Sequence, residues 1–249
     1  MNLETASPEW KTIAVSDGTA MRVYIARPKP GPAKVPAVLV LQEAFGVNAH
    51  IQDVAGRFAR EGFLAIAPEL YHRTAEGFDA PYSDFASAIP HLQAITTANL
   101  VADLQATFDQ VVKEPRADPG QVAVVGYCLG GRAAFIANAV LPLRAAVSYY
   151  GGRIHLLLDQ AKDQHGPLLL FWGGQDEHIP AEQIRPIGDA LRGAGKAYTE
   201  VTFSEADHGF FCDQRESYHP PSAQQSWELT LRFLKDSGLK SVGPFNSTD

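Results

Sequence analysis

One cysteine lies where the sequence is best arranged for nucleophilic chemistry. Residues 126–131 read Gly-Tyr-Cys-Leu-Gly-Gly, follow the valine-rich run 122–125 and precede a stretch of small residues. This order predicts a strand, a tight turn that carries Cys128, and a helix. The helix N-terminus would favour a thiolate, and the Leu129 amide would lie where a developing oxyanion is bound. Cys128 is therefore predicted to be a nucleophile, and an ordinary buried cysteine is the alternative.

An acid and a histidine follow this cysteine in the order that a strand-turn-helix nucleophile requires. Asp176 comes after the strand predicted at residues 167–173, and His208 comes after the strand predicted at 198–203. His208 is predicted to be the general base, and Asp176 to fix its tautomer. Taken singly, Asp176 is also explained as a helix cap and His208 as a hydrogen-bonded loop residue. Three neighbouring polar residues are weaker candidates for the roles of acid and base: Glu177, His178 and Asp207.

Strands and helices alternate along the chain and must bring these residues together. Strands are predicted at residues 11–15, 21–26, 37–41, 63–68, 121–126, 145–150, 167–173 and 198–203. Helices are predicted at 49–61, 95–113, 130–140, 181–193 and 224–235. This alternation is typical of an α/β protein with a mostly parallel central sheet flanked by helices, whose sites lie at the carboxyl ends of the strands. The first two strands, joined by the turn Ser16-Asp17-Gly18-Thr19, predict an antiparallel N-terminal edge hairpin.

Two segments are predicted to lack regular structure. Residues 71–90 mix glycine, proline and charge without a firm period, which favours a long loop with at most one short helix, placed as a wall or lid over a site. Residues 238–249 are predicted to be a loosely held tail. The 249 residues are 45% hydrophobic, which favours a single domain, residues 1–249, built on one large core.

The composition argues against several classes of function. The net charge is −7, from 21 basic and 28 acidic residues, and binding to nucleic acid needs a basic surface instead. The first ten residues lack a positively charged start followed by an apolar run, so no signal peptide is predicted. The longest apolar stretches are too short to span a bilayer. We therefore expect a cytoplasmic protein without membrane or nucleic-acid partners.

Cys128 and Cys212 are the only cysteines, which excludes a framework of disulfides. No Cys-x-x-Cys pair or His-x-x-x-His cluster is present, so we expect no metal, and no organic cofactor is implied. Two alternatives to hydrolysis remain. In a thiol redox enzyme, Cys212 would resolve an oxidised Cys128. A non-catalytic module would only keep a small-molecule pocket.

Four motifs remain to be taken together: Gln42-Glu43-Ala44-Phe45-Gly46-Val47-Asn48, residues 126–131, Gly173-Gly174-Gln175-Asp176 and His208-Gly209-Phe210. They resemble the dienelactone hydrolase family, whose members have the α/β-hydrolase fold. The resemblance spans most of the chain, from about residue 37 to the last helix. It implies a triad of Cys128, Asp176 and His208. It also implies that Glu43 takes the proton of the cysteine when substrate binds. A salt bridge to an arginine is the alternative role for Glu43. The Ala44 amide would complete the oxyanion hole with Leu129.

The sequence departs from dienelactone-cleaving relatives at the arginines that hold the substrate carboxylate in those enzymes. The fourth residue after His208 is Cys212, and residues 82–97 contain no arginine. Arg73 and Arg215 are the nearest replacements, and Arg73 is kept as a substrate-binding candidate, although a surface position is the simpler explanation for both. We therefore expect neutral substrates to be preferred over anionic ones. The predicted pocket lining is mostly aromatic: Phe45, Tyr127, Tyr150 and Phe210.

The sequence as a whole predicts a cysteine-dependent hydrolase of a small ester or lactone. Cys128 would attack the acyl carbon, and the Ala44 and Leu129 amides would hold the oxyanion. His208 would shuttle protons and activate the hydrolytic water. The small-molecule substrate is the only partner expected, and the chain is compatible with a monomer or a homodimer.

Overall fold

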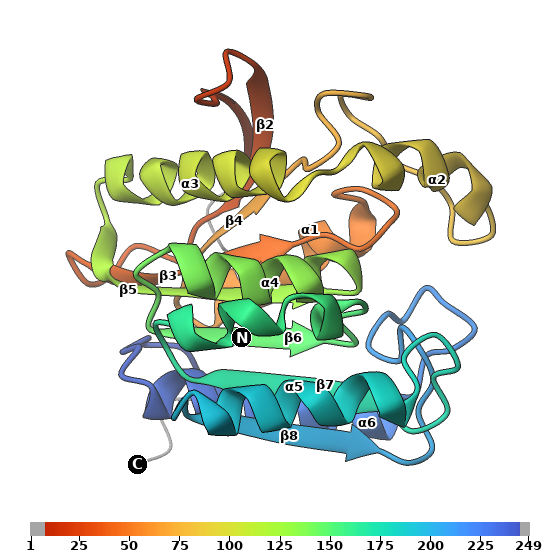
Figure 1. The fold of residues 1–249 in the computed structure, drawn as a ribbon. Coiled ribbons are helices and arrows are strands. Elements are labelled where there is room, and N and C mark those ends of the chain that lie inside the picture. Colours follow the sequence, from red (N-terminus) through yellow and green to blue (C-terminus); the bar gives the residue numbers. More distant parts are fainter. Residues whose placement is uncertain (1–7, 245–249) are drawn as a thin grey trace.

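The computed structural model describes residues 8–244 and places eight strands in one sheet (Figure 1). Their order across the sheet is β1-β2-β4-β3-β5-β6-β7-β8. β2 pairs antiparallel with both β1 and β4, and the remaining pairs are parallel. The predicted mostly parallel sheet with an antiparallel hairpin at its edge is therefore confirmed. The strands are β1 (Glu9–Ala14), β2 (Ala20–Ala26), β3 (Val35–Leu41), β4 (Leu64–Pro68), β5 (Ala117–Tyr127), β6 (Ala145–Tyr149), β7 (Leu168–Gly173) and β8 (Tyr198–Phe203).

Helices cover both faces of the sheet, and in Figure 1 α4 and α5 lie in front of it and α6 behind it. Successive strand residues point to opposite faces, so Val38 packs in the cluster that contains Phe58 of α1, whereas Leu39 packs with Leu104 of α3. Burial on both faces explains why the central strands are apolar throughout. The helices are α1 (Ala49–Arg60), α2 (Phe85–Ala94), α3 (Thr97–Lys113), α4 (Leu129–Val140), α5 (Ala181–Gly193) and α6 (Pro220–Asp236), with 3-10 turns η1 (Ile154–Leu156) and η2 (Leu158–Asp163).

The segment predicted as a long loop at 71–90 runs into α2. Asp84 caps this helix by accepting a hydrogen bond from the Ser87 amide at 3.2 Å. The helix then continues past the predicted segment and stops before Thr96, whose hydroxyl caps α3 by accepting from the Asn99 amide at 3.2 Å. Within residues 8–244, no helix combines the length and apolar composition needed to cross a bilayer.

The first part of the predicted loose tail, residues 238–244, packs against the rest of the molecule. Leu239 is 0% exposed, and its amide donates to the Leu234 carbonyl at 3.1 Å. A side chain at Gly243 would collide with the backbone of Glu61. Burial of an apolar side chain is what holds this segment in place. The remainder of the predicted tail, residues 245–249, lies outside the described residues.

Candidate active site

The backbone turns sharply at Cys128, between β5 and α4. Its dihedral angles are φ 54° and ψ −110°, a combination that residues other than glycine rarely adopt. The Cys128 amide donates to the Tyr149 carbonyl at 3.0 Å, and the Gly130 amide donates to the Gln42 carbonyl at 2.9 Å. The residues at the ends of β6 and β3 therefore fix the turn. The strand, turn and helix predicted around Cys128 are all present.

Two glycines allow α4 to begin against the ends of the strands. A Cβ atom at Gly126 would collide with the Gly130 carbonyl, and one at Gly130 would collide with the Leu41 carbonyl. Only residues without a side chain fit at these two positions. These glycines therefore let strand and helix approach closely enough to present the thiol at the carboxyl end of β5.

Asp176 and His208 meet just past the ends of β7 and β8. The Nδ1 atom of His208 lies 2.7 Å from Oδ2 of Asp176. The other carboxylate oxygen accepts from the amides of His178 and Ile179, at 2.8 and 3.2 Å, which orients the carboxylate. The His208 ring is also in hydrogen-bond contact with the Cys128 thiol. The structure thus brings together the three residues that the sequence predicted as a triad.

Charge interactions within this group act on both the acid and the base. Burial by itself lowers the pKa of His208, but Cys128 and Asp176 outweigh burial and raise it to about 10. Burial by itself raises the pKa of Asp176, but the hydrogen bond and charge of His208 outweigh it and hold the pKa below its ordinary value. His208 therefore holds a proton at neutral pH and is suited to pair with a thiolate.

Glu43 follows β3 and is 1% exposed. Arg215 Nη1 lies 3.3 Å from Glu43 Oε1, and among the described residues Glu43 Oε2 has no hydrogen-bond partner. The structure therefore shows the salt bridge that the sequence left as the alternative role for Glu43. The Arg215 guanidinium also lies 5.8 and 5.7 Å from the ring centroids of Phe45 and Tyr82. This packing leaves the Arg215 side chain 21% exposed, between a surface position and a buried one.

A cavity of about 200 Å³ opens beside the Cys128 side chain. Ala44 and Leu129, whose amides were predicted to hold an oxyanion, both line it. Helix α2, which begins in the segment predicted as a wall, contributes Phe85 to the lining. This volume suits a small substrate. The other lining residues are Leu92, Arg132, Gly152 and Arg153.

Comparison with known proteins decides the family. The model of the dienelactone hydrolase family matches residues 21–238. The chain belongs to the dienelactone hydrolase family. A Yersinia pestis protein provisionally named a carboxymethylenebutenolidase is 37% identical over 242 residues, which cover 93% of this chain and 90% of that protein. The carboxymethylenebutenolidase of Pseudomonas putida is 31% identical over 221 residues, which cover 88% of this chain and 92% of the relative.

Solved structures agree with this assignment. The crystal structure of a Klebsiella pneumoniae protein provisionally named a dienelactone hydrolase superposes with a TM-score of 0.83 at 32% identity, covering 92% of this chain and 99% of that one. This member of the dienelactone hydrolase family therefore has the α/β-hydrolase fold and is a carboxylic-ester hydrolase.

This dienelactone hydrolase family member does not use the predicted aromatic lining at Cys128. Tyr127, Tyr150 and Phe210 are 0% exposed, Phe45 is 3% exposed, and none of the four is among the residues that line the cavity. Tyr127 stacks inside an aromatic cluster, and the Tyr150 ring lies 5.1 Å from the ring of His208. The turn after β5 presents the cysteine to the cavity but leaves the preceding side chain, Tyr127, in the core. These rings therefore pack in the core next to the site and do not line the cavity.

Arg73 is not brought to the site either. Its guanidinium makes two hydrogen bonds of 2.8 Å to Asp103 and one of 2.7 Å to Asp17. It borders a different cavity, next to α2 and α3. Because two carboxylates already satisfy its charge, Arg73 is not available as a clamp for substrate.

Two other arginines, Arg132 and Arg153, line the cavity at Cys128 and were missed in the sequence. Arg132 carried a usable signal, because it lies in the first turn of the helix predicted directly after Cys128. Arg153 carried none, because the loop after β6 places it and no motif marks it.

A buried group beside the site contains Glu43, His50 and Cys212, whose potential metal-binding atoms all lie within 4.8 Å of one another. Burial lowers the pKa of His50. Burial, and after it the charge of Glu43, raises the pKa of Cys212 to about 12. A thiol held protonated in this way attacks poorly, which counts against Cys212 as a resolving cysteine. The guanidinium of Arg215 beside Glu43 also opposes the binding of a cation here.

Proposed function

We propose that this chain hydrolyses a small carboxylic ester or lactone through an acyl-enzyme formed on Cys128. The observation that carries the proposal is the continuous contact from Asp176 through His208 to Cys128, at a turn that faces a cavity. Membership of the dienelactone hydrolase family supports ester hydrolysis as the reaction class.

In the proposed reaction, the Cys128 thiolate attacks the acyl carbon and forms a carbon–sulfur bond. The Ala44 and Leu129 amides stabilise the oxyanion, and His208 gives its proton to the alkoxide as the carbon–oxygen bond breaks. In the second half, the neutral His208 takes a proton from water, which attacks the thioester. Cys128 leaves as a thiolate and His208 is protonated again. Asp176 holds the imidazole in the orientation that both halves need.

The role of Glu43 as acceptor of the thiol proton is part of this proposal. Its Oε2 atom lacks a hydrogen-bond partner among the described residues and is the atom available for that transfer. Its other oxygen is held by Arg215, which is also within electrostatic range of Cys128. We therefore assign His208 as the principal proton partner and Glu43 as a second acceptor whose position depends on Arg215.

The direct test replaces the nucleophile. Cys128→Ala should lower hydrolysis of phenyl acetate by several powers of ten with the fold intact, and Cys128→Ser should be weak or inactive, because a serine needs stronger help from the base. Mass spectrometry of the wild-type protein during turnover should find the acetyl group on the peptide that contains Cys128. An alanine variant that keeps most of the activity would show the assignment to be wrong.

Cys212→Ala is the matched control, because it removes the other cysteine and leaves the proposed nucleophile in place. We expect this variant to keep ester hydrolysis. Peroxide consumption with a reversible Cys128–Cys212 disulfide, and no ester hydrolysis in the wild type, would favour the redox alternative instead.

A further inference from the structure

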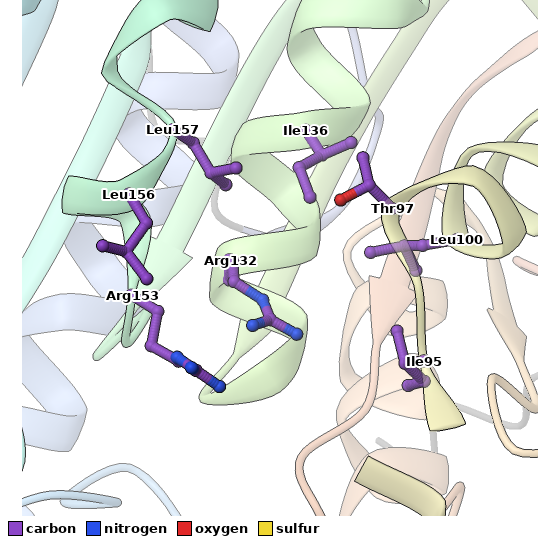
Figure 2. Close-up of a pocket in the computed structure, with 8 residues that line it drawn as sticks. All are labelled: Ile95, Thr97, Leu100, Arg132, Ile136, Arg153, Leu156 and Leu157. Carbon is purple, nitrogen blue, oxygen red and sulfur yellow. The ribbon is translucent and has the colours of Figure 1, made fainter. Parts of the chain in front are cut away.

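Two cavities adjoin beside α4, because Arg132 and Arg153 border both of them. One is the cavity beside Cys128, and the other, drawn in Figure 2, has a volume of about 210 Å³. This second space, here called the α4 cavity, is where a long substrate held at Cys128 would extend. Apart from the two arginines, the α4 cavity is lined by Ile95, Thr97, Leu100, Ile136, Leu156 and Leu157.

The lining of the α4 cavity is aliphatic on both sides. Figure 2 shows Leu156 and Leu157 on one side and Ile95 and Leu100 on the other. Leu156 is 61% exposed although its side chain is large and apolar. Exposed apolar side chains that gather at a hollow mark a place for a ligand or partner, whereas scattered ones do not. The α4 cavity therefore suits an apolar group.

The two arginines are compatible with an apolar group beside them. Arg153 is exposed, so water solvates its charge. Burial, and after it the charge of Arg153, lowers the pKa of Arg132, whereas the charge of Cys128 raises it. A Cys128 thiolate is therefore a counter-charge for Arg132. Arginine side chains also carry three methylene groups, which cover apolar surface while the guanidinium keeps its polar surroundings.

Helix α4 sets the direction from the nucleophile into the α4 cavity. It begins at Leu129, directly after Cys128, and Arg132 and Ile136 lie one turn apart on the same face. The helix rises about 10 Å from Leu129 to Ile136, which an extended chain of roughly eight carbons spans. His208, which gives its proton to the leaving alcohol, borders neither cavity. The space along α4 is therefore left to the acyl part of the substrate.

The loop after β6 supplies the wall opposite α3. Arg153 starts the turn η1 with a φ of 67°, in the left-handed region that residues with a side chain rarely adopt. Ile154 is 0% exposed and anchors the turn in the core, and its carbonyl accepts from the Leu157 amide at 2.8 Å. Such a conformation persists only where the surrounding structure imposes it, often at functional sites. It brings Leu156 and Leu157 to the α4 cavity.

We propose that the α4 cavity binds the end of an unbranched apolar acyl chain, so that the substrates of this site are neutral esters whose acyl chains have roughly six to eight carbons. The inference rests on the proposed reaction at Cys128 and names the substrate class of that same site. The chain and the aliphatic lining leave water together, and this gain persists in the transition state. The acyl part carries no charge, in line with the preference for neutral substrates expected from the sequence.

The test varies the length of the acyl chain with the alcohol held constant. Phenyl esters of acetic, butanoic, hexanoic and octanoic acid are compared below their solubility limits. We expect kcat/KM to rise from the butanoate to the octanoate by about two- to fourfold for each methylene group that enters the α4 cavity. Thr97→Trp fills the cavity from an exposed position at the start of α3 and should lower the ratio of octanoate to acetate about tenfold or more. Leu156→Asn makes one wall polar at similar size and should lower the same ratio severalfold.

Leu229→Asn is the matched control, because Leu229 is an exposed leucine of α6 that lines neither cavity. It should leave the ratio of the two kcat/KM values unchanged. A second control moves the chain to the alcohol: hexyl acetate and ethyl acetate should differ equally in the wild type and in Thr97→Trp. No rise with acyl length, a ratio that Thr97→Trp and Leu156→Asn leave as it was, or a preference for hexyl acetate that Thr97→Trp removes would overturn the inference.

A binding measurement separates this inference from the proposed reaction. Calorimetric titration of Cys128→Ala with hexanamide and acetamide, which are both neutral, needs no turnover. We expect hexanamide to bind more tightly and Thr97→Trp to remove the difference. That result, together with a wild-type protein that hydrolyses none of the phenyl esters, would support the acyl-chain site and reject the reaction. Hydrolysis of all four esters, with equal binding of the two amides, would reject the acyl-chain site and leave the reaction standing.

Discussion

The properties of the candidate site depend first on how individual polar atoms are partnered. The carboxylate of Asp176 divides its two oxygens between backbone amides and the His208 ring, so its position and that of the ring are coupled. Glu43 has one oxygen paired and one unpartnered within the described residues. Since an unpartnered buried polar atom is costly, such atoms mark places where chemistry or ligand binding is expected.

The pH dependence of acylation follows from His208. Burial lowers its pKa, but Cys128 and Asp176 raise it to about 10, so the proton needed by the leaving alcohol is present until the pH rises through that value. We expect kcat/KM to decline on this alkaline side. Asp176→Asn removes one cause of the raised pKa and should move the alkaline limb to lower pH, as a pH profile for phenyl acetate would show. A limb that stays in place would mean that another group controls it.

At the scale of secondary structure, the site depends on how closely α4 starts against the strands. The carbonyl of Leu41 at the end of β3 occupies the space that a side chain at Gly130 would need. The same close approach places the N-terminus of α4 next to the thiol and aims Arg132 at the cavity. One contact between helix and strands therefore sets the position of the nucleophile and of Arg132 together.

Gly130→Ala tests this contact. The added methyl group must displace backbone, so we expect a loss of stability of about 1–3 kcal/mol and a larger loss of activity, because the turn and the helix start must shift. Urea denaturation and kcat/KM for phenyl acetate measure the two effects. Gly193→Ala, at the end of α5 where a Cβ meets nothing within 4 Å, is the control and should not destabilise. Equal behaviour of the two variants would contradict the argument.

At the scale of the whole molecule, residues far apart in the chain meet at one edge of the sheet. Glu43 and Arg215 are 172 positions apart and form an ion pair that joins the end of β3 to the segment after β8. This pair ties the N-terminal half of the sheet to the loop that follows His208. Its contribution is therefore to the assembly of the site as well as to its charge.

Arg215→Gln should leave a buried, unpaired carboxylate and destabilise the protein by about 3–5 kcal/mol. Glu43→Gln in the same chain should recover part of that loss, because the uncompensated charge is then removed. Urea denaturation of the wild type, both single variants and the double variant gives the coupling energy. Additive effects would mean that the pair does not stabilise the fold. A loss of kcat in Glu43→Gln with little change in stability would favour its role as a proton acceptor.

The sequence by itself determined the order of strands and helices and the position of Cys128, Asp176 and His208 at the ends of strands. It could do so because local patterns fix these features: strands buried on both faces are continuously apolar, and a tight turn between strand and helix admits only glycine beside its apex. The family follows from the same motifs, and the matching family model covers them.

The tertiary structure alone decided which charges meet and which side chains face the cavity. Arg215 reaches Glu43, Arg73 is taken by Asp103, and the predicted aromatic lining turns into the core. Arg132 and Arg153 instead border the space beside Cys128. These outcomes depend on contacts between segments that are distant in the chain, and on one loop residue whose backbone adopts the left-handed conformation. The local periodicity of the sequence carries no signal for either. The catalytic residues can therefore be identified from the sequence, whereas the residues that line the cavity are decided by packing.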